Sequence, residues 1–288
     1  MRIEYLFDSF KSVMGLEIKI SGYCLVAALH IVGLVLLHKA KLQIQNQKII
    51  LMNLSVSEML FCLFESFYFL NELVWSSETL KYVIVGITSI SFLNVRFAMF
   101  HFIIDRFLDI WLNLKYPLYF SKKILTIIII TQWILSFILV VVMITLLNFK
   151  VIGWYTVQIV RLSMDIIIVI AALITFPYLF VKVKNAIHLN VGQERKQNRI
   201  FIALLKLKVP MLMVITYIAF NTTYSIFVFT WSYSGKSSFT FEILDICGWG
   251  SDVFIYVFLQ KRVRRLLFSS CLKENRNQVG DTHTSSVR

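Results

Sequence analysis

The sequence holds little charge, proline and glycine for its length. Of 288 residues, 16% are charged and 58% are hydrophobic. A soluble domain carries about 25% charged residues, so this composition excludes an ordinary soluble fold. With only 3 prolines, 10 glycines and no evident internal repeat, the chain also lacks the interrupted helices and repeats of many transporters.

The few cysteines exclude a framework of extracellular disulfides. Three of the four lie in apolar blocks, and the fourth, Cys271, lies near the C-terminus, so none can crosslink surface loops. No closely spaced Cys and His residues indicate a metal site, and no HExxH-like motif indicates a membrane enzyme. Residues 1–18 carry both charge signs without an apolar core, so we expect no cleavable signal peptide.

Long apolar blocks dominate the rest of the sequence. The mean hydropathy is +0.74, and the blocks reach about 20 residues or more, which is enough for a helix to cross a bilayer. We predict an all-α fold, a seven-transmembrane helix bundle. The expected spans are 19–40, 48–73, 82–111, 122–147, 155–187, 194–232 and 239–259.

The basic residues predict the orientation of this bundle. The net charge is +13, and most Lys and Arg lie in alternate connections and after the last block. The positive-inside rule places those segments in the cytoplasm and explains the charge without nucleic acid as a partner. We therefore expect residues 1–18 to be extracellular and residues 19–260 to form the membrane domain.

The segment after the last span is expected to lie on the cytoplasmic leaflet. Residues 261–271 can place basic and apolar side chains on opposite faces of a short amphipathic helix. Cys271 is the candidate site for lipid attachment. The polar residues 272–288 are expected to form a disordered tail, whose hydroxyl groups are candidate phosphate acceptors for arrestin binding.

Charged residues inside the apolar blocks are the first functional candidates, because a charge in the membrane is costly unless it is paired. Asp105 and Arg106 stand together at the end of the third block. Simple anchoring at the membrane interface is the alternative interpretation of this pair. Glu58, Arg96 and Asp165 lie deeper in their blocks and are expected to face the bundle interior.

Five motifs, in order, resemble those of the rhodopsin-like (class A) G-protein-coupled receptors over about residues 22–271. The position of the usual asparagine in helix one holds His30. The motifs are Asn53-Leu54-Ser55-Val56-Ser57-Glu58, similar to NLAxAD; Asp105-Arg106-Phe107, similar to DRY; the triplet Leu114-Lys115-Tyr116; the helix-four tryptophan Trp133; and Asp252-Val253-Phe254-Ile255-Tyr256, similar to NPxxY without its proline.

The chain also departs from this family. The family disulfide is absent, Ile170 holds the position of the helix-five proline, and Tyr217 or Tyr224 replaces the helix-six tryptophan. This pattern loosely resembles the melanocortin-type receptors. The position of the retinal lysine holds Ile246, unlike an opsin, and the position of the amine-binding aspartate holds Thr88, unlike a classical amine receptor.

The resemblance implies a plasma-membrane receptor that binds an extracellular ligand and activates a heterotrimeric G protein. It implies that Asp105 holds Arg106 at rest, and that Tyr178 and Tyr256 close over Arg106 on activation. The usual helix-six acid is not evident, and Glu194 is the nearest, so we expect a weak lock and basal signalling. The alternative functions are a receptor-fold protein that does not signal, acting as a scaffold or decoy, and a transporter.

The resemblance also places Glu58 and Asp252 face to face near mid-membrane, where the family often holds a sodium ion. Two close carboxylates need a cation or a shared proton. Arg96 has two candidate partners, Asp165 and Asp252, and in the second case its guanidinium would take the place of sodium.

Acidic residues in the extracellular half predict the ligand pocket. Their excess over Arg161 favours a cationic small molecule or a basic peptide, and solvated rim charges are the alternative interpretation. The candidate pocket residues are Glu65, Thr88, Phe92, Tyr224, Glu242 and Asp245.

Overall fold

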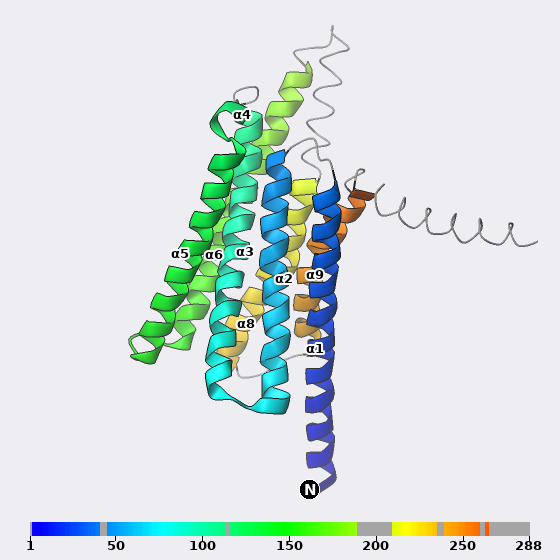
Figure 1. Ribbon diagram of the computed structural model, residues 1–288, viewed down its shortest axis with the longest axis vertical. Coiled ribbons are helices and arrows are strands. Elements are labelled where there is room, and N and C mark those ends of the chain that lie inside the picture. The colour runs from blue at the N-terminus through cyan, green and yellow to red at the C-terminus, as the bar shows by residue number, and fades with distance from the viewer. Residues whose placement is uncertain are drawn as a thin grey trace, which may run out of the picture.

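The computed structural model describes residues 2–40, 45–112, 116–188, 209–234, 239–259 and 263–264, and all regular elements in these ranges are helical (Figure 1). Residues 209–217 are helical and continue through a π-helical turn into α8. The elements are α1 (Arg2–Lys39), α2 (Gln45–Leu70), the π-helical turn η1 (Asn71–Trp75), α3 (Glu78–Leu112), α4 (Tyr116–Tyr119), α5 (Lys122–Asn148), α6 (Trp154–His188), the π-helical turn η3 (Ile218–Thr222), α8 (Thr223–Ser234) and α9 (Phe239–Leu259).

Six of the described helical segments are long and apolar enough to cross a membrane. This confirms the expected all-α, multi-pass character of the chain. The seventh expected segment is α9, a helix of 21 residues that packs against α1, α2 and α8. The six segments are Gly15–Lys39, Asn46–Trp75, Glu78–Leu112, Lys122–Asn148, Tyr155–Lys182 and Val209–Thr230.

Apolar side chains on the outside of the bundle fit a lipid environment. Along α5, Ile130, Phe137 and Val141 are about half exposed, and along α6, Ile167 and Leu173 are exposed to a similar degree. A surface of this kind is rare on soluble proteins. In lipid it is favoured, because a helix satisfies its own backbone hydrogen bonds and shows the bilayer only apolar side chains.

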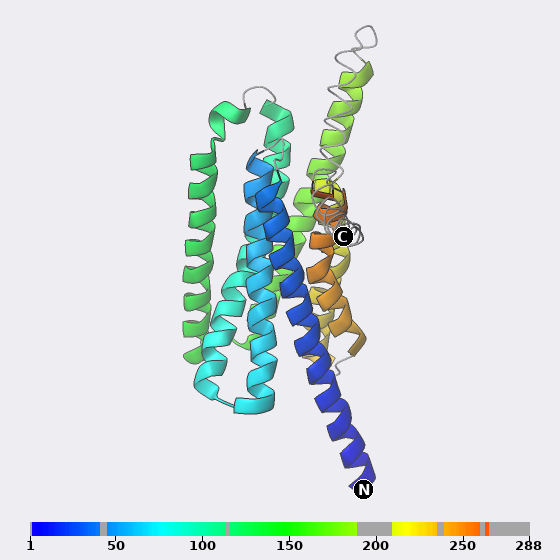
Figure 2. The same ribbon diagram turned by 45° about the vertical axis from the view of Figure 1, so that its right-hand side comes forward.

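Successive long helices run in opposite directions along the bundle (Figures 1 and 2). One end holds α4, the end of α3 and the start of α5, and we call it the α4 end. The other end holds η1 and the turn between α5 and α6, and we call it the η1 end. Helices α2 and α3 pack closely on each other, with α1 against α2 and with α5 and α6 against α3.

The helix boundaries differ from the expected spans chiefly at the N-terminus. Helix α1 begins at Arg2, so the described part of the expected extracellular segment 1–18 continues the first helix past its apolar span. Residues 194–208, most of the expected amphipathic segment 261–271, Cys271 and the tail 272–288 lie outside the described residues.

The close approach of α9 to η3 leads to the first testable prediction. A Cβ added at Gly248 would lie 2.8 Å from Cβ of Phe220, whereas one at Gly86 would meet only Cδ1 of Ile144 at an ordinary 3.8 Å. We expect Gly248→Ala to lower the melting temperature, because overpacking costs about 1–3 kcal/mol. The matched control Gly86→Ala should leave it unchanged or raise it, because alanine favours helix.

Thermal unfolding of the purified protein in detergent measures both variants. Equal melting temperatures for Gly248→Ala and the unchanged protein would contradict the packing of α9 against η3.

Candidate functional site

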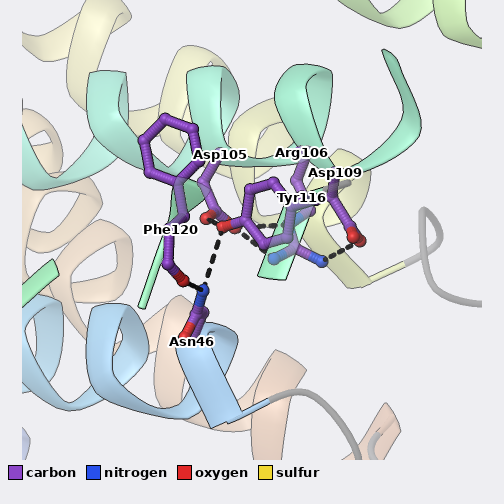
Figure 3. A network of polar contacts seen from close by, with 6 residues as sticks. All are labelled: Asn46, Asp105, Arg106, Asp109, Tyr116 and Phe120. Carbon is purple, nitrogen blue, oxygen red and sulfur yellow. Dashed lines mark hydrogen bonds and ion pairs between the residues drawn. The ribbon is translucent and has the colours of Figure 1, made fainter. Parts of the chain in front are cut away.

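Asp105 and Arg106 form a buried ion pair at the α4 end (Figure 3). Arg106 Nε donates to Asp105 Oδ2 at 3.0 Å, and Nη2 contacts the same oxygen more closely. Arg106 Nη1 reaches Oδ2 of Asp109, one turn further along α3, at 3.4 Å. The exposed fractions of Asp105 and Arg106 are only 3% and 1%. This buried guanidinium therefore contacts two carboxylates of its own helix.

Tyr116 connects the short helix α4 to this ion pair through hydrogen bonds. Its hydroxyl donates to Oδ1 of Asp105 and accepts from Nδ2 of Asn46 at 3.3 Å, and the same Nδ2 donates to the carbonyl of Phe120 at 2.8 Å (Figure 3). Burial and then the charge of Asp105 raise the pKa of Tyr116, so its hydroxyl keeps its proton and stays a donor. The chain after α3 thus closes back over the ion pair.

Neither tyrosine expected to cover Arg106 contributes to this cluster. Tyr178 is 44% exposed, and its ring packs on that of Phe107 with the centroids 5.6 Å apart. The buried Tyr256 hydrogen-bonds Ser55 Oγ at 3.0 Å. The expectation for these two residues concerned an activated state, so it stays a prediction. Glu194, the nearest acid expected near helix six, lies outside the described residues.

A second buried ion pair crosses the middle of the bundle. Arg96 Nε lies 2.9 Å from Asp165 Oδ1, and Arg96 Nη2 donates to Oδ2 at 3.1 Å. The hydroxyl of Tyr217 donates to Asp165 Oδ1 at 2.7 Å, and Ser225 donates to Oδ2. Of the two partners left open for Arg96 by the sequence, the structure has Asp165. The pair connects α3 with α6, and the hydrogen bonds of Tyr217 and Ser225 connect α6 with the residues on both sides of η3.

The π-helical turn η3 explains how Tyr217 and Ser225 both reach Asp165. They are eight residues apart and flank this turn. A π turn holds about one residue more than an α turn, so one turn of each kind spans about eight residues and brings both side chains to one face. In a regular α-helix of about 3.6 residues per turn they would diverge.

Glu58 and Asp252 meet in the bundle core, as the resemblance implies. Both residues are 2% exposed and their carboxyl groups interact with each other, so they need a cation or a shared proton between them. His30 Nε2 donates to the carbonyl of Trp249 at 2.9 Å and lies 3.6 Å from Glu58 Oε2. His30 Nδ1 lies 3.0 Å from Ser55 Oγ. This network connects α1, α2 and α9, and the choice between a sodium ion and a shared proton stays a prediction.

A cavity of about 440 Å³ opens among the helices toward the η1 end. That volume suits a small-molecule ligand. Its wall is mainly apolar and includes Val140, Met143 and Leu147 of α5. Its lining also includes Arg161 and five of the six residues expected to form a pocket. These five are Glu65, Thr88, Phe92, Tyr224 and Asp245.

The sixth expected pocket residue, Glu242, belongs to α9, but its side chain lies outside the described ones. Sequence reasoning also missed several residues that complete the sites. Asn46 and Phe120 carry no distinguishing motif. Asp109 had a usable signal, since an acid three residues after an arginine on one helix lies within reach of it.

Comparison with known proteins identifies no family, because no protein-family model matches the sequence and no curated protein is significantly similar to it. The features that bear on function are therefore the chain's own residues. Among the described residues, these features include the three buried polar clusters and the cavity near the η1 end that are described above.

The contacts of Tyr116 predict the effect of removing one oxygen atom. Tyr116→Phe deprives Asp105 of a buried donor, which costs about 1–3 kcal/mol, so we expect a lower melting temperature. The neighbouring Tyr119 is 59% exposed, and Tyr119→Phe is the matched control that should change nothing. A Tyr116→Phe protein as stable as the control in thermal unfolding would contradict the role of this hydroxyl.

The Arg96–Asp165 pair predicts a larger loss. Arg96→Leu leaves a buried carboxylate without its cation, which costs about 3–5 kcal/mol, and the double variant Arg96→Leu/Asp165→Leu should recover much of that loss. The control is Lys81→Leu, which removes an exposed pair with Glu72 and should have little effect.

Surface expression and thermal unfolding measure these variants. A normally expressed Arg96→Leu protein with an unchanged melting temperature would refute the structural role of the pair.

Proposed function

We propose that this chain is a G-protein-coupled receptor, which binds an extracellular ligand and activates a heterotrimeric G protein through its α4 end. The observation that carries the proposal is the buried Asp105–Arg106 pair at the end of α3, closed by Tyr116. A buried charge pair at the end of α3 can act as a switch, because separating the pair leaves the guanidinium without a counter-charge unless another partner binds it.

The distribution of basic residues supports this orientation in the plasma membrane. Lys39, Lys48, Lys122 and Lys182 all lie at or near the helix ends of the α4 end, which the positive-inside rule assigns to the cytoplasm. With α9 as the seventh span, the N-terminus is then extracellular and the cavity opens toward the ligand side.

The helix formed by residues 209–234 supports a route from ligand to switch. Its Tyr224 lines the cavity, while its Tyr217 holds Asp165 in the middle of the bundle. A ligand that shifts Tyr224 would act on the same helix that carries Tyr217, and π-helical turns such as η3 often mark functional sites in helices. Allosteric coupling through this helix requires that it adopt two states which the ligand binds with different affinity.

The decisive variants change Arg106 or its nearest carboxylate. With matched surface expression, the intact chain should activate a G protein in cells without added ligand, and Arg106→Ala should reduce this to the level of cells lacking the receptor. Asp105→Asn, which frees Arg106 from its nearest carboxylate, should raise it several-fold. Lys123→Ala changes an exposed cation at the same end and should have no effect.

The measurement is G-protein activation recorded for each G-protein class in turn. Silence of both the intact chain and Asp105→Asn, in cells that display them on the surface, would favour the alternative of a receptor-fold protein that does not signal.

A further inference from the structure

Two buried polar atoms without a hydrogen-bond partner belong to side chains that line the cavity at the η1 end. They are Thr88 Oγ1 and Arg161 Nε. Asp245 lines the same cavity, and its Oδ2 accepts from the hydroxyl of Tyr23 at 2.7 Å. The exposed fractions of Thr88 and Asp245 are 8% and 2%. Buried polar groups are nearly always paired in folded proteins, so polar atoms left over around one cavity point to a polar ligand that completes them.

The cavity is lined by acidic and basic groups that form no ion pair with one another in the described structure. Glu65 on α2 and Asp245 on α9 each supply a carboxyl group, and Arg161 on α6 supplies a guanidinium. Two such carboxyl groups are ionised together only when a cation lies between them. In the described part of the structure, Arg161 forms no ion pair with either carboxylate. The other arginine of this region, Arg96, is already neutralised by Asp165.

Aromatic rings hold the guanidinium of Arg161 at the cavity wall. Its Cζ lies 4.1 Å from the centroid of the Phe92 ring and 5.3 Å from that of Tyr224. Cation–π contacts orient a guanidinium without neutralising it, so they leave its N–H groups able to bind a planar anion. A carboxylate, which pairs with arginine through two parallel hydrogen bonds, has the matching shape.

The apolar part of the wall lies between α3 and α5. Val85 of α3 and Val140, Met143, Ile144 and Leu147 of α5 line it. These side chains can cover a hydrocarbon or aromatic group of several carbon atoms, and they offer no partner for further charge.

We propose that this cavity binds a zwitterion, an amino-acid-like molecule with an ammonium group, a carboxylate and a large apolar group. The ammonium meets Asp245 and Glu65, the carboxylate meets Arg161, and the apolar group packs on α5. A simple cation leaves Arg161 unpaired, and a simple anion lies beside two carboxylates. This inference rests on the proposed receptor function only for its biological meaning, because the binding itself is independent of any G protein.

Binding to the purified full-length protein in detergent tests the proposal, since a ligand that prefers the folded state raises the melting temperature. The probes are two zwitterions, L-phenylalanine and L-leucyl-L-phenylalanine, which differ in the separation of their charges. L-phenylalaninamide keeps only the cation, and N-acetyl-L-phenylalanine keeps only the anion. At least one zwitterion should bind about tenfold or more tightly than either singly charged probe.

Variants of Arg161 and Glu65 test which group of the ligand each residue binds. Arg161→Gln should remove the preference for L-phenylalanine over its amide, and Glu65→Gln should reduce the preference over the N-acetyl form. Arg161→Lys keeps a cation at the same place and should retain part of the preference. Lys150→Gln removes an exposed cation at the same end and is the matched control, which should bind every probe as the unchanged protein does.

The possible results separate this inference from the proposed function. Equal binding of zwitterion and amide, equal binding of zwitterion and N-acetyl form, or no binding of either zwitterion would overturn the ligand class. Basal G-protein activation could then still be present and would leave the receptor proposal intact. Binding of a zwitterion to a protein that activates no G protein would support the ligand class and contradict the receptor proposal.

Discussion

The fold depends on the rule that a charge removed from water must keep a partner in the membrane. The Arg96–Asp165 pair is where this rule acts most strongly, since both side chains are fully buried. Hydroxyl groups of Tyr217 and Ser225 saturate the same carboxylate. These contacts fix the relative positions of α3, α6 and the helix of residues 209–234. The π-helical turn η3 allows two side chains of that last helix to reach Asp165.

The same pair lies next to the cavity through Phe92. Cζ of Arg96 lies 3.3 Å from the centroid of the Phe92 ring, and Cζ of Arg161 lies 4.1 Å from it. Phe92 thus touches one cation that the protein has neutralised and one that lines the cavity. A ligand that draws Arg161 aside acts directly on the aromatic neighbour of Arg96, so the path from the cavity to the central ion pair needs only this one ring. Such a path is a physical connection, and coupling along it still requires two states of different ligand affinity.

Sequence reasoning predicted the six membrane-compatible helices of the described structure, because an apolar block long enough for the bilayer has few alternatives. It also placed five of six pocket residues, since position along a span fixes depth in the membrane. It left the partner of Arg96 open, because that choice depends on how each helix is rotated about its own axis. A π-helical turn adds about one residue to a turn and so changes this rotation, and the amino-acid composition does not reveal where such a turn lies. The contact of Tyr116 with Asp105, and that of Asn46 with Tyr116, depends on how α4 packs against α3 and α2. The packing of such short connecting helices follows no rule of depth in the membrane.

The expected charge of the ligand depends on the arrangement of the charged residues, which a count of those residues does not include. Counting Glu65, Glu242 and Asp245 against Arg161 yields net negative charge and favours a cation. Electrostatic energy depends on distance, and steeply so in a medium of low dielectric constant. An arginine that forms no ion pair with the acids around it in the described structure remains a site for an anion, whatever the total charge. The arrangement of these side chains, and not their number, therefore decides which ligand leaves no charge of the cavity unpaired.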